Sequence, residues 1–306
     1  MASLRQIRQR IRSIQSTKQV MRAMQLVSGS KFKRAQSRLL QGRQGLEFLD
    51  GLLQRVLVAE GDPERARRSG GVEGRPHLLH PLMAHHEHKP SALLIVTSDT
   101  GLAGAYNTNL IQLADGELRR DTAQPTQVSY VGKRGHRYFT KRGYAAKDAY
   151  LDLAGRPDIG KIDAIGKVFV DRFLSGDISS VKLLYAKFIS PTVSRPTIKQ
   201  WLPIQLAPIT QSPNHLITKS ADDYIFEPSP ERVFEDLLPR WAMATFRVAL
   251  LEAFTSEHGA RMIAMKNATD NAQEILGSLT MQRNKIRQAA ITKELSEIVG
   301  TVEALK

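Results

Sequence analysis

The stretch DTGLAGAYN, residues 99–107, is the pattern in this chain that most suggests catalysis. Its first three residues, Asp99-Thr100-Gly101, follow an apolar run, as the catalytic aspartate of an aspartic protease would. Protease chemistry needs two carboxylates that share a proton, and the chain has no second Asp-Thr-Gly or Asp-Ser-Gly sequence. We therefore interpret the stretch as a turn from a strand into a helix, with Asp99 at its start.

The glycines of the same stretch are spaced as in many phosphate-binding loops. The stretch lacks both Gly-x-Gly-x-x-Gly and the Walker sequence that ends in Gly-Lys-Ser/Thr. Gly132-Lys133-Arg134 and Gly166-Lys167-Val168 lack the hydroxyl residue that would bind Mg²⁺. The sequence therefore favours a tight turn over a nucleotide site, and we predict no cofactor bound by this chain.

Histidines gather in one short segment rich in Gly, Pro and Arg. Five of the eight fall there, at His77, His80, His85, His86 and His88. Imidazoles at this density could chelate a transition metal. No patterned carboxylates accompany them, and the chain has no cysteine to supply thiolate ligands or disulfides. Solvated side chains in a loop are the more common outcome, and we predict no metal site.

Two long helices bracket the segment that holds these candidate residues, and the first helix is marked by a heptad repeat. The repeat runs through Leu4, Ile7, Ile11, Ile14, Lys18, Met21, Gln25, Ser28, Phe32, Ala35, Leu39, Gly42, Leu46, Leu49, Leu53 and Val56. Apolar residues at these a and d positions predict a coiled-coil helix of about 53 residues, roughly 80 Å long. Lys18, Gln25 and Ser28 make the seam polar in its middle.

The same N-terminal helix carries most of the chain's net charge of +14. Residues 1–43 hold eleven Lys and Arg and no acid, whereas residues 231–306 hold ten bases and ten acids. A concentrated basic face predicts an acidic partner, which could be nucleic acid, anionic lipid or an acidic protein surface. The chain has no apolar run of about 18 residues, so we expect membrane association only through partners.

Two other functions fit an Arg-rich, acid-free N-terminus. A mitochondrial presequence has this composition, but the heptad repeat continues past residue 50, which a removable peptide does not need. Nucleic-acid binding also fits the charge, but no zinc pattern or aromatic-bearing strand accompanies it.

Between the ends, apolar strands alternate with amphipathic helices. We expect strands at 92–99, 127–132, 181–189 and 197–204, and helices at 107–120, 134–144 (or a turn) and 165–176. This alternation predicts an α/β layer of about 120 residues.

The second long helix opens at Ser229-Pro230-Glu231, an N-cap followed by a first-turn proline and an acid. Helical periodicity then continues to the end of the chain, with Pro239 as a site where it kinks or restarts. Its apolar positions are Leu237, Trp241, Val248, Leu251, Met262, Met265, Ala272, Ile275, Leu279, Ile286, Ile291, Leu295, Ile298 and Val302.

The predicted fold class is α/β, with a long antiparallel coiled coil of the N- and C-terminal helices and an inserted Rossmann-like α/β domain. The predicted segments are a coiled-coil helix at 1–58, a linker or loop at 59–90, the α/β domain at 91–210, a connector at 211–228 and a second coiled-coil helix at 229–306.

Three separated stretches together resemble the gamma subunit of F-type ATP synthases. They are IRQRIRSIQSTKQVMRAMQLVSGSKFKRAQ, IVTSDTGLAGAYNTNLI and the tail SEHGARMIAMKNATDNAQEILGSLTMQRNKIRQAAITKELSEIVG. Within the tail, MKNATDNA and NKIRQAAITKELSEIV are the most specific. The family often has Cys where this chain has Ala103, and the His-rich segment has no counterpart that we can place.

The resemblance implies a central rotor shaft that performs no bond chemistry of its own. Its coiled coil would stand in a ring of three alpha and three beta subunits, with the α/β domain as a foot near the epsilon subunit and the membrane c-ring. Proton flow would turn the shaft and drive the beta sites through their states. ATP, ADP and Mg would bind the alpha and beta subunits, at the cytoplasmic face of a bacterial plasma membrane.

The resemblance also implies roles for individual residues. Contacts with the beta subunits are implied for Met24 in MRAM and for a basic track formed by Lys31, Lys33 and Arg34. They are also implied for Arg287, Gln288 and Thr292 in RQAAIT, which match the family's catch, a group that hydrogen-bonds a beta-subunit loop. An apolar bearing tip falls on Ile298, Val299, Val302 and Leu305. Exposed charge pairs, each contributing roughly 0–1 kcal/mol, would let the shaft turn without deep energy minima. The alternative is a basic coiled-coil protein that binds nucleic acid or acts as a scaffold.

Overall fold

The computed structural model describes residues 4–60, 80–86, 88–120, 126–153, 158–205 and 226–304. His77, Leu305 and most of the predicted linker and connector lie outside these ranges. The chain divides into two compact units, Met1–Ser30 with Arg261–Lys306 and Lys31–Ala260. The predicted segment boundaries stay predictions, since each long helix contributes to both units.

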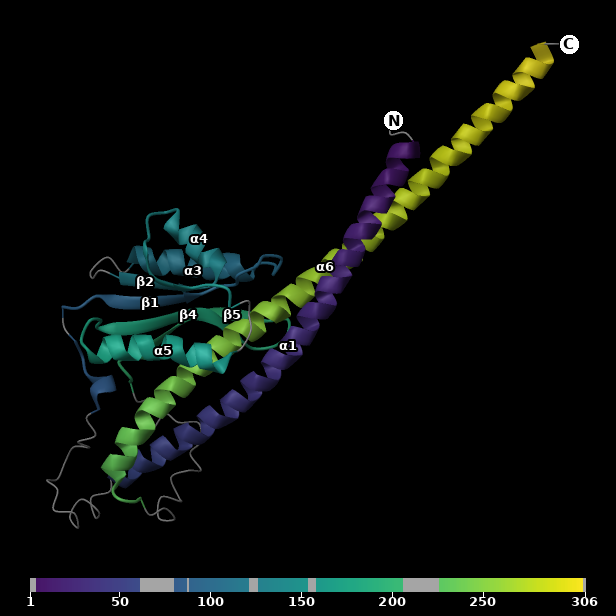
Figure 1. Ribbon diagram of the computed structural model, residues 1–306. Helices are drawn as coiled ribbons and strands as arrows, with labels where there is room; N and C mark the ends of the chain where they lie inside the picture. Colours follow the sequence, from purple (N-terminus) through teal and green to yellow (C-terminus); the bar gives the residue numbers. More distant parts are fainter. Residues whose placement is uncertain are drawn as a thin grey trace. The chain divides into compact units, whose positions relative to one another are not determined.

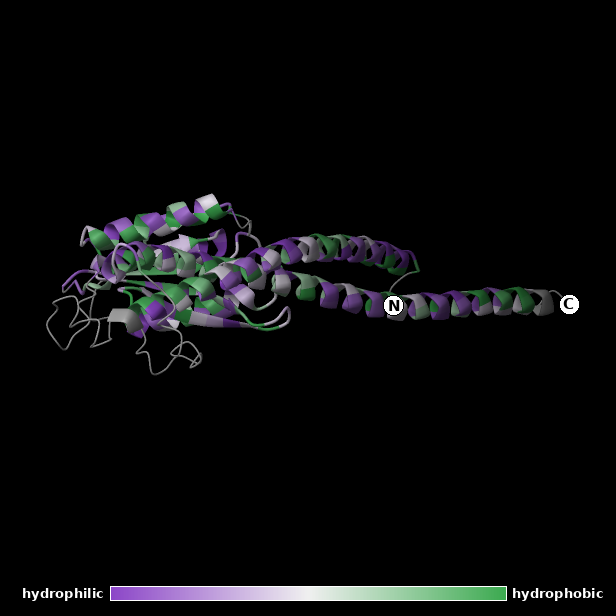
Figure 2. Ribbon diagram, turned by 90° about the horizontal axis from the view of Figure 1, so that it is seen from below, coloured by the Kyte–Doolittle hydropathy of each residue, from purple (hydrophilic) through white to green (hydrophobic). Residues whose placement is uncertain are grey.

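The two long helices are α1, Leu4–Glu60, and α6, Pro230–Ala304 (Figure 1). The start of α6 confirms the predicted cap, because the Ser229 hydroxyl accepts from the Arg232 N–H (3.3 Å) and the Ser229 carbonyl accepts from the Val233 N–H (3.1 Å). Pro239 lies inside α6, which neither breaks nor restarts there. Figure 2 shows polar and apolar residues interleaved along both helices.

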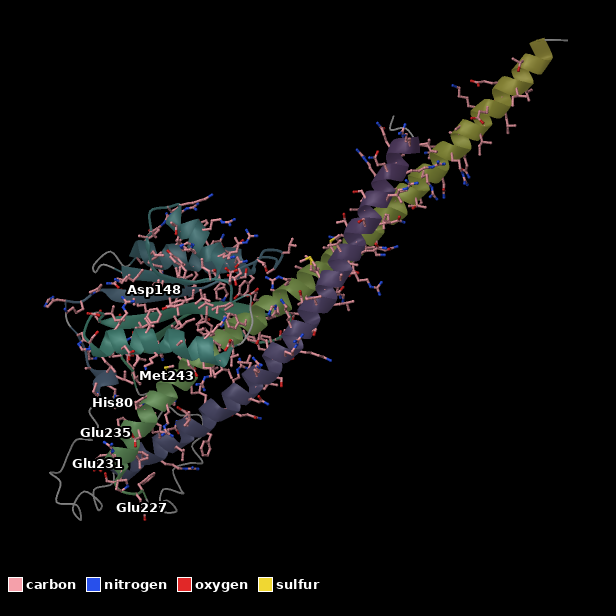
Figure 3. The ribbon with its side chains drawn as sticks, viewed as in Figure 1. His80, Asp148, Glu227, Glu231, Glu235 and Met243 are labelled. Atoms are coloured by element: carbon pink, nitrogen blue, oxygen red, sulfur yellow. The ribbon has the colours of Figure 1, made fainter. Side chains whose placement is uncertain are left out.

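His80 compensates for the proline. Pro239 has no N–H, so the Glu235 carbonyl four residues earlier lacks its usual helical donor. The His80 imidazole forms a hydrogen bond with the backbone of Glu235, and its Nδ1 accepts from the Leu82 N–H (3.0 Å). Figure 3 shows His80 beside this part of α6. His80 thereby attaches the short 3₁₀ helix η1, Pro81–Met83, to α6.

A five-stranded sheet forms the centre of the Lys31–Ala260 unit. Its strands are β1 Ser91–Val96, β2 Thr126–Val131, β3 Ala146–Tyr150, β4 Ser180–Phe188 and β5 Ser194–Leu202, in the order β3-β2-β1-β4-β5. Strands β3, β2, β1 and β4 run parallel to one another, and β5 runs antiparallel to β4. All of β1 is buried, as its continuous apolar sequence requires of a strand covered on both faces.

Helices cover both faces of this sheet (Figure 1). On one face lie α3, Tyr106–Arg120, and α4, Lys133–Thr140; on the other lies α5, Ile159–Leu174. Alternate residues of β1 point into two separate cores: Leu93 and Ile95 into the α3–α4 core, Leu94 and Val96 into the α5 core. The α5 core also takes in residues of α1 and α6, among them Leu39, Leu53, Leu238 and Phe246.

These findings confirm the predicted fold class. An α/β domain with a mostly parallel sheet is inserted between two long helices. Within the unit formed by the two chain ends, the helices run antiparallel, because Ile7 and Ile11 pack with Leu276 while the later Lys18 bonds to the earlier Gln273. None of the helices that the structure describes is both long and apolar enough to cross a membrane.

Candidate functional site

Asp99 holds together the carboxyl edge of the sheet. Its Oδ1 accepts from the backbone N–H of Lys133 (3.1 Å) and from that of Asp152 (3.2 Å). The first amide follows β2 and the second follows β3, so one carboxylate ties the ends of three strands. The Asp152 carboxylate in turn pairs with the Lys133 ammonium at 2.5 Å. This geometry agrees with the predicted turn and gives Asp99 a structural role.

The histidines of the His-rich segment make separate contacts where the structure describes them. His80 bonds to backbone groups, as above. The His86 ring packs edge-on against Phe173 of α5, with ring centroids 4.9 Å apart. Across the described ranges, no group of three or more His, Asp or Glu side chains could hold a metal ion. His77 lies outside these ranges.

In the unit formed by the chain ends, the predicted seam separates buried from exposed residues. Ile7 and Ile11 are buried with Leu276, and Ile14, Leu279 and Ile286 pack beside them. The polar seam residues are wholly or partly buried as well: Ser28 is buried, Gln25 is half-buried, and the half-buried Lys18 donates to the Gln273 side chain. Met24, one of the predicted beta-contact residues, is half-buried beside this seam.

The predicted catch residues lie further along α6 in the same unit. Arg287, Gln288 and Thr292 are all exposed. Gln288 and Thr292 stand one turn apart on one face, and the Thr292 hydroxyl donates to the Gln288 carbonyl (2.9 Å). That bond fixes the hydroxyl while its oxygen can still accept a hydrogen bond from a partner.

The predicted bearing tip follows the catch. Ile298 and Val299 are 59% and 61% exposed. The Val302 side chain and Leu305 lie outside the described part of the chain. Exposed apolar residues of this size require a partner surface if they are to leave water.

The basic track belongs to the other unit. Lys33 and Arg34 are exposed and Lys31 is half-buried. At 3.6 residues per turn, Lys31 and Arg34 stand about 60° apart around α1, whereas Lys33 points to another side. The structure therefore places two of the three cations on one face and not all three.

A group of cations missed by the sequence interpretation lies beside the 101–104 turn. Arg134, Arg137, Lys141 and Arg142 of α4 and its C-terminal turn line one pocket with that turn. The spacing in RGHRYFTKR carried the signal, but only the fold brings this helix beside a turn some 30 residues earlier in the chain.

Comparisons with known proteins agree over the full length. A family model described as ATP synthase matches residues 3–305. The ATP synthase gamma chain of Symbiobacterium thermophilum is 37% identical over 300 residues, which cover 98% of this chain and 97% of that protein. The ATP synthase gamma chain of Moorella thermoacetica is 37% identical over 306 residues, 100% of each chain.

Solved structures share the fold at low sequence identity. A chain of the Euglena gracilis mitochondrial ATP synthase (OSCP/F1/c-ring, rotational state 3) aligns with a TM-score of 0.63 at 17% identity, covering 99% of this chain and 94% of that one. A chain of the Tetrahymena thermophila central stalk/c-ring aligns with a TM-score of 0.53 at 20% identity, covering 81% and 99%. Because the family model spans nearly the whole sequence and full-length relatives share over a third of its residues, the chain belongs to the ATP synthase gamma chain family.

Proposed function

We propose that the chain is the central rotor shaft of a rotary ATP synthase and couples transmembrane proton flow to the conformational cycling of catalytic beta subunits. Its relatives are named ATP synthase gamma chain, and chains with its fold come from the rotor and central stalk of such complexes. The alternative of a nucleic-acid-binding or scaffold protein finds no support among these relatives.

One observation carries the proposal. Every residue from 287 to 301 of α6 is exposed, on all sides of the helix. Four of them are large and apolar: Ile291, Leu295, Ile298 and Val299. At 100° per residue these four side chains lie within about 100° of one another, so they form one apolar stripe on a helix that is exposed on every side, and such a stripe needs a partner surface if it is to leave water. A sleeve formed by other subunits meets that requirement and still permits turning.

The specific partners follow from the same proposal. The C-terminal part of α6 and the region around Met24 would contact the alpha and beta ring. The α/β domain would contact the epsilon subunit and the c-ring. Membrane attachment would come only through these partners, at the cytoplasmic face of a bacterial plasma membrane. The chain itself would bind no catalytic cofactor, since ATP, ADP and Mg would bind the alpha and beta subunits.

The catch residues offer the test of this coupling. We expect the double substitution Arg287→Ala/Gln288→Ala to lower ATPase turnover of the assembled complex several-fold and to leave nucleotide affinity of the beta subunits unchanged. Two exposed polar contacts contribute about 0.5–1.5 kcal/mol each, and about 1.4 kcal/mol is a tenfold change in rate.

The control is Gln282→Ala/Lys285→Ala, which removes the same kinds of group from exposed positions nearby on α6. Steady-state ATPase assays and nucleotide-binding titrations give the two readouts. Equal turnover in both double variants would remove the assigned role of Arg287 and Gln288, and loss of nucleotide binding would point to a failure of assembly instead.

A further inference from the structure

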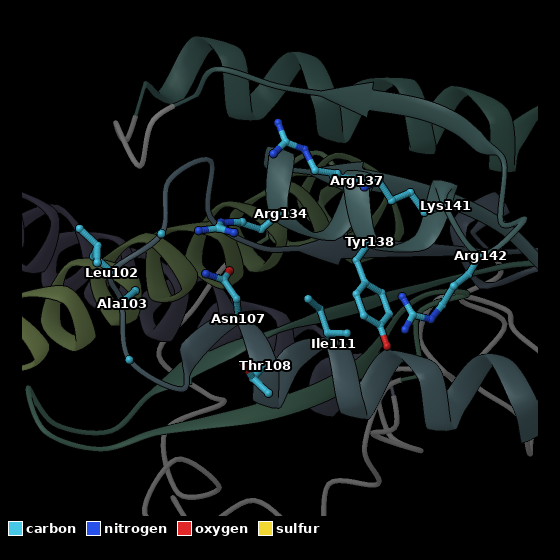
Figure 4. Close-up of a pocket in the computed structure, with 12 residues that line it drawn as sticks. Leu102, Ala103, Asn107, Thr108, Ile111, Arg134, Arg137, Tyr138, Lys141 and Arg142 are labelled. Carbon is cyan, nitrogen blue, oxygen red and sulfur yellow. The ribbon is translucent and has the colours of Figure 1, made fainter.

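A pocket opens at the carboxyl edge of the sheet, where β1 and β2 end. Its volume is about 390 Å³. The turn after β1, the first two turns of α3, and α4 with its C-terminal turn supply the lining (Figure 4). The volume falls within the usual range for small-molecule sites.

The charge of this pocket has one sign. Four cationic side chains line it, Arg134, Arg137, Lys141 and Arg142, and no acidic residue does. All four are exposed, and none forms an ion pair with a carboxylate among the described residues. Such a concentration of positive charge creates a local potential that attracts anions. The fold does not need these four cations for its stability, because exposed side chains compensate no buried charge.

Other groups give the pocket a fixed geometry. The Arg142 guanidinium lies over the Tyr138 ring, 3.6 Å from its centroid, which holds the guanidinium plane in place. The Asn107 side chain is oriented by Ser98, whose N–H donates to Asn107 Oδ1 (3.1 Å) and whose Oγ accepts from Asn107 Nδ2 (2.8 Å). Asn107 stands in the first turn of α3, where helix amides favour a negative ligand.

The turn itself is strained. Leu102 lies at the rim of the pocket with φ at 61° and is 60% exposed. An apolar, non-glycine residue held in the left-handed region costs roughly 1–3 kcal/mol, and such strain gathers at ligand sites. Arg134 lies so close to Gly101 that a Cβ added there would overlap its guanidinium. The turn therefore keeps backbone and guanidinium together at this end of the pocket.

The charge selects the class of ligand. A phosphodiester, as in a phospholipid headgroup, has one negative charge, and a single terminal phosphate has about −1.5 to −2 at pH 7. A diphosphate group comes closer to balancing four cations, and guanidinium forks bind phosphate oxygens in pairs. We propose that this pocket binds the diphosphate group of a soluble ligand, as in inorganic pyrophosphate or a nucleoside diphosphate. The proposal uses residues of the α/β domain alone and stands independently of the rotor function.

The first test measures pyrophosphate binding to the full chain by equilibrium dialysis. We expect Arg134→Gln/Arg142→Gln to weaken binding at least ~10-fold, since each lost charge-assisted contact is worth about that factor. The matched control Lys161→Gln/Lys167→Gln removes two exposed cations from α5, on the opposite face of the sheet, and should change the affinity less than about twofold. All four substituted residues are exposed, and circular dichroism should show the same fold in both variants.

The second test locates the ligand without substitution. Phenylglyoxal modifies exposed arginines, and mass spectrometry reads each site. We expect pyrophosphate to protect Arg134, Arg137 and Arg142 but not the exposed Arg195 of β5. Equal weakening by both double variants, or equal protection of Arg195, would overturn the proposal in favour of unspecific charge attraction. Binding of phosphatidylglycerol vesicles through these arginines, with no pyrophosphate binding, would overturn it in favour of a lipid surface.

Discussion

At the scale of single residues, the carboxyl edge of the sheet is held by a few short polar contacts. The Thr97 hydroxyl donates to the Val131 carbonyl (3.2 Å) and accepts from the Gly135 N–H (2.9 Å). Together with Asp99, it fixes the turns after β1 and β2. Residues that look catalytic in the sequence thus build the edge on which the basic pocket is placed.

Gly132 is the position on this edge where a side chain has no space. Its φ is 91°, and a Cβ there would overlap the Thr97 carbonyl and lie 2.8 Å from its carbon. We expect Gly132→Ala to cost about 1–3 kcal/mol in backbone strain, and about 1–3 kcal/mol more from the overlap. Thr97 cannot yield, because its N–H donates to Val131 across the strand pair.

Gly143 supplies the matched control. Its φ is 90° and an added Cβ would meet nothing within 4 Å, so Gly143→Ala should show the backbone cost alone. Urea unfolding of the full-length variants measures both free energies. If the two alanine variants were equally stable, the overlap with Thr97 would contribute nothing to the free energy of unfolding.

His80 makes stability depend on pH. Burial lowers its pKa below 6.5, and the nearby Glu235 only partly opposes this. The unfolded chain therefore takes up the proton first, and the folded state loses stability as the pH falls below about 6.5. We expect His80→Asn, which does not titrate and can still accept from the Leu82 N–H, to lose less stability between pH 7 and pH 5. His85→Asn, at an exposed position, is the control, and thermal melts across this range would refute the idea if both variants tracked the parent.

At the scale of elements, heptad counting placed the seam of α1 correctly. Every a and d position from Leu4 to Val56 is buried or half-buried. Four of the apolar positions counted in α6 are exposed, namely Ile275, Ile291, Leu295 and Ile298. At the first of these the count is off by one residue, because Ile275 is 50% exposed whereas its neighbour Leu276 is 8% exposed and packs in the seam. A straight helix has 3.6 residues per turn, so a pattern counted over many turns drifts around its surface.

The edge strand β3 could not be predicted from its sequence. Its residues, AKDAY, include two charges and are at most half-buried, so they lack the apolar run that marks the other strands. Backbone pairing with β2 and the Arg172–Asp148 ion pair (3.1 Å) keep it in place. Those contacts depend on the tertiary fold, and no local sequence pattern indicates them.

An ion pair joins three elements of the α/β unit. Arg43 of α1 pairs with Glu252 of α6 at 2.6 Å and donates to the Phe188 carbonyl of β4 at 2.8 Å. The Glu252 side chain is only 7% exposed. We expect Arg43→Met to cost about 3 kcal/mol, the lower end of the range for breaking a buried pair, because Arg43 itself is one-third exposed.

The double variant Arg43→Met/Glu252→Gln should recover most of that loss, since no unpaired charge stays buried. Urea unfolding followed by tryptophan fluorescence suits the measurement, because both tryptophans lie in this unit. Additive losses in the double variant would show that the pair has no mutual stabilisation.

At the scale of the whole molecule, fold and family could be predicted, but the pocket could not. The heptad ends and the tail motifs identified the chain, and the partner-contact residues came from that resemblance alone. The basic pocket combines residues 101–104 with 134–142, which only the parallel pairing of β1 and β2 brings together. Sequence motifs report on neighbours along the chain, so a site assembled across a sheet edge escapes them.

The proposed rotation of this chain inside its complex can be measured directly, because the chain has no cysteine. Lys161→Cys places a single thiol on an exposed face of α5 for attachment of a bead. With the alpha and beta subunits fixed to a surface, ATP should drive the bead in one direction, with three evenly spaced dwell angles. A bead that stays still while the same complexes hydrolyse ATP would contradict the account.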